Sequence, residues 1–126
     1  ASRIIAVDLF DNRLELAEAL GATHTINSSS MNPILLRSQI EKILDRKSID
    51  VFIDNTGNTK IIELGYKLVK GDGKVVLVGV PNANENIEIH SLDIHFGKKL
   101  IGSHGGNAQP EKDIPRYHQL SYLIGH

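Results

Sequence analysis

The 126-residue chain contains no cysteine, which excludes a disulfide framework and a metal site built from thiolates. No apolar run approaches the roughly 20 residues that a bilayer-spanning helix needs, and the amino end lacks the charged-then-apolar pattern of a signal peptide. Fourteen Lys and Arg residues nearly balance fifteen Asp and Glu residues, so the charge indicates neither nucleic acid nor a membrane as a partner. We therefore expect a soluble, cytoplasmic protein with a single core.

The opening segment is apolar from Ile4 to Val7 and ends in Asp8. This pattern predicts a short buried strand whose carboxyl end presents Asp8 to a crevice. In doubly wound α/β folds, an acidic residue at the end of the second strand commonly accepts hydrogen bonds from the adenosine ribose of NAD. Asp8 is therefore a candidate ribose ligand, and the plain alternative is a solvated Asp at a helix entrance.

Strands and helices alternate along the rest of the chain. Further strands are expected at residues 23–27, 48–54, 74–80 and 99–103, with a short edge strand at 87–89. Asp11 or Asn12 is expected to cap the first helix. Asn32 is expected to cap the second, which begins at Pro33, a third begins near Thr59, and a last helix covers about residues 113–123. This alternation predicts one α/β domain, residues 1–126, with a parallel sheet.

Two local expectations accompany these elements. Leu16, Ala17 and Leu20 are spaced to share one face of the first helix, which Gly21 ends. Residues 71–73, Gly-Asp-Gly, are expected to form a turn before the most strand-like segment of the chain.

Several short motifs then occur in a specific order and spacing. They are Asp8, residues 16–22 followed by Ile26 and Asn27, and residues 54–57, 71–81 and 100–106. With these motifs the chain, from residue 1 to about residue 120, resembles the cofactor-binding domain of medium-chain, zinc-dependent alcohol and polyol dehydrogenases. The resemblance implies an NAD-dependent oxidoreductase that acts on a small-molecule alcohol, polyol or sugar hydroxyl.

The resemblance also implies which residues contact the nicotinamide dinucleotide. Asp8 would hold the adenosine ribose and favour NAD over NADP, and Arg13 would lie beside the adenosine. Three further sets would lie along the cofactor, one after each of two strands and one at the end of the last strand: Thr56 and Gly57; Gly79, Val80 and Pro81; Ile101, Gly102 and Ser103. Ordinary turn chemistry at Thr56-Gly57, a strand stop at Pro81 and a surface position for Arg13 are the plain alternatives.

The chain departs from the family in ways that matter for function. The family's first strand, its glycine-rich phosphate turn and its zinc ligands are not in this sequence, so we expect an incomplete, Rossmann-like, doubly wound parallel sheet that is a partial NAD-binding domain. Such a fragment holds no catalytic residue and no zinc, and is expected to be inactive alone. In the usual strand order 3-2-1-4-5-6, the first strand lies at the centre. The family's strands 2 and 4 correspond here to the opening strand and to residues 48–54. We therefore expect these two strands to pair directly, the chain to borrow a strand from a partner, or the chain to be poorly stable.

The remaining expectations concern metals, partners and rival functions. The six histidines form no set with metal-ligand spacing, so we expect structural or surface roles for them. The last sheet edge, at residues 87–89 and 99–103, is where the family pairs subunits, which suggests a homodimer. Two rival functions stay open: a fragment of an adenosylmethionine-dependent methyltransferase, and a non-catalytic nucleotide-binding or dimerisation module.

Overall fold

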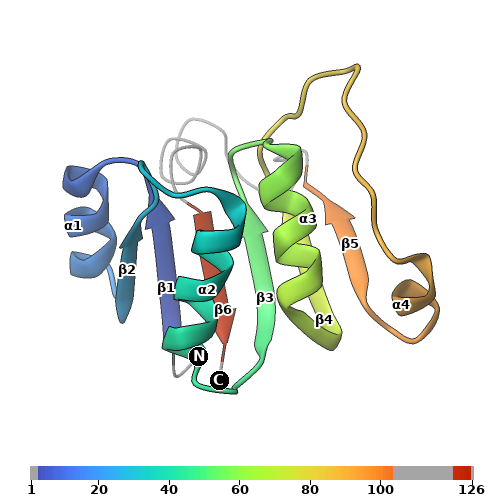
Figure 1. Ribbon diagram of the computed structural model, residues 1–126, viewed down its shortest axis with the longest axis horizontal. Coiled ribbons are helices and arrows are strands. Elements are labelled where there is room, and N and C mark those ends of the chain that lie inside the picture. Colours follow the sequence, from blue (N-terminus) through green and yellow to red (C-terminus); the bar gives the residue numbers. More distant parts are fainter. Residues whose placement is uncertain (1–2, 104–120, 126) are drawn as a thin grey trace.

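The computed structural model describes residues 3–103 and 121–125 of the chain. Its strands form one sheet in the order β2-β1-β6-β3-β4-β5 (Figure 1). The pairs β1–β2, β3–β4 and β4–β5 are parallel, whereas β6 runs antiparallel to both β1 and β3. The bounds are β1 Arg3–Asp8, β2 His24–Asn27, β3 Ile49–Asp54, β4 Val69–Leu77, β5 Lys99–Gly102 and β6 Ser121–Gly125.

Helices pack on both faces of this sheet. They are α1 (Asp11–Ala19), α2 (Pro33–Leu44), α3 (Thr59–Leu68) and the short α4 (Ser91–His95). Apolar residues of α2 and α3 form the main core with Ile5 and Val7 of β1, on the face that Figure 1 presents. Ala6 points to the opposite face, as alternation along a strand requires, and packs against Leu14 and Ala17 of α1. The predicted α/β, doubly wound class is therefore confirmed.

None of the helices within the described ranges has the length and hydrophobicity required to cross a membrane.

The two predicted helix caps have different outcomes. The side chain of Asn32 accepts a hydrogen bond from the backbone N–H of Leu35 at 2.8 Å, and Pro33 is the first residue of α2. The predicted start of α2 is therefore confirmed. By contrast, α1 begins at Asp11 without a side-chain cap, so the capping role predicted for Asp11 or Asn12 is wrong.

The predicted apolar face of α1 is also wrong in part. Leu14 and Ala17 are its buried residues, whereas Leu16 and Leu20 are 57% and 61% exposed. The side of a short helix that meets the sheet depends on the direction in which the chain leaves the preceding strand. The spacing of leucines does not encode that direction.

Residues 69–73, which lie between α3 and the strand predicted at residues 74–80, belong to that strand instead of forming a turn. The strand β4 begins at Val69, and its register against β3 shifts, so that Val69 lies opposite Ile49 and Lys74 lies opposite Val51. The Gly-Asp-Gly turn predicted at residues 71–73 is thus an irregular stretch inside a longer strand. Residues 87–89 form no strand, so that prediction is wrong, and α4 was not predicted.

The centre of the sheet holds the largest departure from expectation. The strand β6 lies between β1 and β3, with Leu123 opposite both Ile5 and Phe52. Direct pairing of β1 with β3, or a strand borrowed from a partner, is therefore not what fills the centre. Of the last predicted helix, residues 113–120 lie outside the described residues, and residues 121–123 are strand. An extended segment satisfies the facing backbone groups of two strands at once, which a helix cannot do.

Tight packing between α3 and β3 gives a first prediction. A Cβ atom on Gly65 would lie 2.5 Å from Cε1 and 2.6 Å from Cγ of the buried Phe52 ring. We expect Gly65→Ala to lower the free energy of unfolding by about 1–3 kcal/mol, because helix or ring must move. Gly71→Ala is the control, because a Cβ there meets nothing within 4 Å. Urea denaturation of both variants is the measurement, and equal stability would contradict the packing described.

The contact between α3 and residue 88 gives a prediction for pH. The backbone N–H of Glu88 donates to the Glu63 carboxylate at 2.8 Å, and this hydrogen bond is the main cause that lowers the pKa of Glu63. A lowered pKa adds stability above the unfolded pKa, which is lost as the pH falls through the folded value. We expect Glu63→Gln to destabilise the chain at pH 7 but not below the folded pKa of Glu63. Denaturant unfolding over a pH series tests this, with exposed Glu41→Gln as the control.

Candidate functional site

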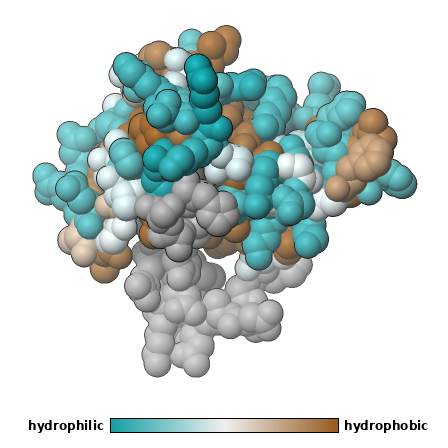
Figure 2. Space-filling model, turned by 90° about the horizontal axis from the view of Figure 1, so that it is seen from below, coloured by the Kyte–Doolittle hydropathy of each residue, from teal (hydrophilic) through white to brown (hydrophobic). Residues whose placement is uncertain are grey.

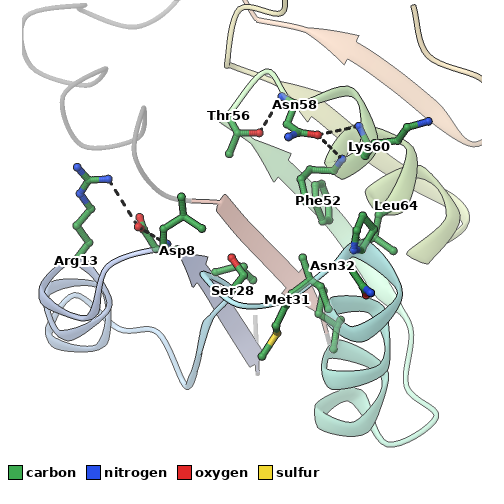
Figure 3. A pocket seen from close by; sticks show the side chains of 16 residues that line it. Asp8, Arg13, Ser28, Met31, Asn32, Phe52, Thr56, Asn58, Lys60 and Leu64 are labelled. Atoms are coloured by element: carbon green, nitrogen blue, oxygen red, sulfur yellow. Dashed lines mark hydrogen bonds and ion pairs between the residues drawn. The ribbon is translucent and has the colours of Figure 1, made fainter.

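A cavity of about 580 Å³ opens at the carboxyl ends of β1 and β3, between α2 and α3 (Figure 3). Apolar side chains such as Leu36, Phe52 and Leu64 form part of its wall. Its polar lining residues are Asp8, Arg13, Ser28, Asn32, Thr56, Asn58 and Lys60. A cavity of this size, apolar with a few convergent polar groups, is typical of a small-molecule or cofactor site.

Asp8 lies at the end of β1, and only one of its two carboxylate oxygens accepts hydrogen bonds from the described residues. Its Oδ1 atom accepts hydrogen bonds from the backbone N–H groups of Leu9 at 2.6 Å and Phe10 at 3.0 Å. Its Oδ2 atom is buried and has no hydrogen-bond partner within residues 3–103. A buried acceptor without a partner costs free energy, so the arrangement is suited to a ligand that donates a hydrogen bond to Oδ2.

Arg13, on the first turns of α1, lines the same cavity. Its Nη1 atom lies 3.7 Å from Oδ1 of Asp8, and its guanidinium carbon lies 4.5 Å from the centre of the Phe10 ring. The structure therefore brings together the two residues predicted to contact adenosine. Figure 3 shows this pair across the cavity from Thr56 and Asn58.

Asp54 organises the loop that follows β3, and the sequence analysis assigned it no role. It is completely buried. Its Oδ1 atom accepts from the hydroxyl of Thr56 at 2.6 Å and from the N–H of Thr56 at 3.2 Å, and its Oδ2 atom accepts from the N–H of Gly57 at 2.9 Å. The pattern of an Asp at a strand end before Thr-Gly was a usable signal, because Asp commonly binds backbone two residues on.

The loops after β3 and β4 touch each other through glycines. Gly57 has φ +71°, and a Cβ there would lie 2.6 Å from the carbonyl oxygen of Val80 and 3.1 Å from the nitrogen of Pro81. A Cβ on Gly79 would in turn overlap the backbone N of Gly57 and lie 2.8 Å from that of Thr56. Only residues without a side chain allow this approach, which places two predicted cofactor segments side by side.

The last predicted residues follow at the end of β5. The backbone N–H of Ser103 donates to the carbonyl of Leu77 at 2.8 Å, so the chain stays beside β4 beyond the strand. Ile101, Gly102 and Ser103 are exposed. Of the ten predicted site residues, Asp8, Arg13 and Thr56 line the cavity, and the rest follow the same edge of the sheet outside it.

The sequence analysis missed several residues that line the cavity. Asn32 caps α2, and the side chain of Asn58 accepts from the N–H groups of Lys60 at 2.9 Å and Ile61 at 3.3 Å to cap α3. Both helices begin at the edge where the preceding parallel strands end. Each cap residue therefore lies at the ligand-binding edge because of the topology. The position of a helix cap soon after a predicted strand could have identified these residues from the sequence.

A second buried polar group lies away from the cavity. The ammonium of Lys98 donates to the carbonyl of Tyr66 at 2.7 Å, and the hydroxyl of Tyr66 donates to the carbonyl of His90 at 2.7 Å. Burial, followed by the charge of Asp93, raises the pKa of Tyr66. These contacts hold α4 against α3. No group of three or more metal-ligating side chains is found within the part of the chain that the structure describes.

Comparison with known proteins decides the family. A protein-family model described as zinc-binding dehydrogenase matches residues 1–121. The chain belongs to this family. Alcohol dehydrogenase 1 of Petunia hybrida is 33% identical over 116 residues, which are 91% of this chain and 30% of the relative. The chain thus spans about a third of the length of such relatives.

Solved structures agree with the family membership. Benzyl alcohol dehydrogenase from Acinetobacter calcoaceticus has a TM-score of 0.70 and 36% identity, covering 91% of this chain and 31% of its own. A zinc-binding dehydrogenase from Sinorhizobium meliloti, solved bound to NADP, has a TM-score of 0.67 and 28% identity, covering 82% of this chain and 30% of its own. The predicted relation to zinc-dependent alcohol dehydrogenases is confirmed.

The role of Asp54 in this dehydrogenase domain gives a prediction. Asp54→Asn keeps the shape but replaces one acceptor by an amide that faces N–H donors. We expect the free energy of unfolding to fall by about 1–3 kcal/mol, and the amides of Thr56 and Gly57 to exchange much faster with solvent. Hydrogen exchange measured by NMR is the test. The control is Asp45→Asn, on an exposed residue with φ 48°, a conformation that Asn also tolerates. Unchanged protection at Thr56 and Gly57 would contradict the role.

Proposed function

We propose that the chain is the NAD(H)-binding portion of a zinc-dependent dehydrogenase that oxidises an alcohol, polyol or sugar hydroxyl. The observation that carries the proposal is the buried, unpartnered Oδ2 of Asp8 in a cavity at the carboxyl ends of the strands. A ribose hydroxyl is a hydrogen-bond donor of the kind that such an oxygen lacks. Family membership supplies the dehydrogenase class.

The residues present fit an adenine dinucleotide at this edge. In the proposal, Asp8 accepts from the adenosine ribose, Arg13 lies beside the adenosine, and the apolar wall that includes Phe52 and Leu64 receives the adenine ring. The remaining predicted residues, Gly57, Gly79, Val80, Pro81, Ile101, Gly102 and Ser103, would carry the cofactor along the ends of β3, β4 and β5. When bound, the dinucleotide would accept a hydride from the alcohol carbon.

The residues do not fit the family's zinc. The sequence has no cysteine, and the described residues offer no cluster of ligands. We therefore assign no catalytic and no metal-binding residue to this chain, and derive no step through a metal. The proposal gives the chain the tasks of binding and orienting the cofactor, with the fragment inactive alone. The relatives named above are dehydrogenases, which favours this reading over a methyltransferase or a non-catalytic module.

We also propose a homodimer through the β5 edge. Among the described strands, β5 pairs only with β4, which leaves its outer backbone groups available to a second strand. Figure 2 shows brown apolar atoms at the end of the molecule where Figure 1 places α4, the element just before β5. Leu92, Ile94 and Phe96 are exposed there. Pairing of two β5 edges would cover both features.

The proposed ribose contact is tested by removing the charge of Asp8. We expect Asp8→Asn to weaken adenosine and NAD binding by about tenfold, because a hydrogen bond to a charged acceptor is replaced by a neutral one. Titration calorimetry of the full chain with each ligand is the measurement, with exposed Glu41→Gln as the matched control. Binding that is unaffected by Asp8→Asn, or absent in the unaltered chain, would refute the proposed function.

A further inference from the structure

Resting on the proposed function, we propose that β6 is a strap that completes the ligand site, so that docking of this strand and binding of the dinucleotide strengthen each other. The ligand binds the chain only while β6 lies between β1 and β3. The last strand then controls ligand affinity from the centre of the sheet.

The cavity lies between two halves of the sheet. The β1 half consists of β2, β1 and α1 and carries Asp8 and Arg13, whereas the β3 half consists of β3, β4, β5 and α3 and carries Phe52 and Thr56. Each half has a helix across its own strands, since α1 contacts β1 and β2, and α3 contacts β3 and β4. Each half is therefore held together locally, and a ligand that fills the cavity contacts both halves.

The strand β6 joins the two halves. It pairs antiparallel with both β1 and β3, and Ile124 lies opposite both Ile4 and Val51. Without β6, the facing edges of β1 and β3 would present unpaired backbone N–H and C=O groups, which are costly when buried. The contact between α2 and α3 also links the halves, but packing of two helices does not fix the spacing of strands. Two hydrogen-bonded ladders do fix it.

The ladders of β6 extend to the ligand-binding edge. The strand pairs with β1 up to Val7 and with β3 up to Ile53. These two residues directly precede Asp8 and Asp54. Because neighbouring strands lie about 4.8 Å apart, the two ladders hold the ends of β1 and β3 about 10 Å apart. The docked β6 thus sets the separation between Asp8 and the loop that Asp54 organises.

The coupling is reciprocal. A ligand that needs both halves at this separation binds the docked form and not the form in which β6 is released, so it shifts the population toward the docked form. With the ligand at 100 times its dissociation constant, release of β6 becomes about 100-fold rarer. The ladder N–H groups of β6 exchange with solvent when the strand is released, so their exchange rate measures the coupling.

The test is hydrogen exchange of the full chain, measured by NMR with and without NAD, together with the dissociation constant of NAD from titration calorimetry. In the free chain we expect the β6 amides to exchange faster than those of Val75 and Val76 in β4, because release of one strand costs less than global unfolding. At 100 times the dissociation constant, NAD should slow exchange of the β6 amides by about 100-fold.

Engineered disulfides supply a matched pair of variants, because the chain has no cysteine of its own. Ile4→Cys with Ile124→Cys joins directly opposite residues of β1 and β6. With this bridge oxidised, the β6 amides should exchange slowly with or without NAD, and reduction should restore the effect of NAD. The control is Lys74→Cys with Lys99→Cys, which joins opposite residues of β4 and β5 within one half. It should leave the effect of NAD on β6 unchanged.

NAD binding that leaves the exchange of β6 unchanged would overturn the coupling and leave the proposed function standing. Equal exchange rates of the β6 and β4 amides in the free chain would do the same, because β6 would then be released only by global unfolding. An effect of NAD on β6 that persists with the β1–β6 bridge oxidised would also contradict the coupling. Absence of NAD binding by the unaltered chain would refute the proposed function as well.

Discussion

The buried carboxylate of Asp54 is the interaction on which the ligand-binding edge depends. The carboxylate accepts hydrogen bonds from the N–H and hydroxyl of Thr56 and from the N–H of Gly57. The backbone carbonyl of Asp54 accepts from the N–H groups of Val78 at 2.7 Å and Gly79 at 3.1 Å. One residue thus closes the loop after β3 and ties it to the end of β4. Because Asp54 is completely buried, its carboxylate would be costly without these donors, so the hydrogen bonds stabilise this conformation of the loop. The glycine contacts between the two loops follow from this arrangement.

Asp8 and Asp54 are both buried acids, at the ends of the two strands β1 and β3 that flank β6, yet their carboxylate oxygens differ in hydrogen bonding. Both oxygens of Asp54 have donors, so it is a structural residue. Asp8 lines the cavity and has donors on Oδ1 only, whereas its second oxygen is buried without a partner among the described residues. The number of donors to each carboxylate oxygen therefore distinguishes a residue that builds the site from one that is available to a ligand.

Local chemistry predicted some elements well and others poorly. The Asn32 cap with Pro33, the β1 strand before Asp8 and the strand ending at Asp54 depend on interactions between near neighbours, and these were predicted correctly. The buried face of α1, where Leu14 replaces Leu16 and Leu20, depends on how the helix meets Ala6. The placement of residues 121–125 depends on two strands more than 65 residues away, a contact that no local pattern describes.

The sequence by itself determined the α/β class, the family and the acidic residue at the first strand end, because apolar periodicity and short motifs are properties of consecutive residues. Only the tertiary structure decided that β6 enters the centre of the sheet, that Asp54 gathers two loops, and that Phe10 and Arg13 surround one oxygen of Asp8 while leaving the other unpartnered within the described chain. These outcomes depend on distances between atoms that are remote in sequence or on rotamers set by packing, and composition carries no information on either.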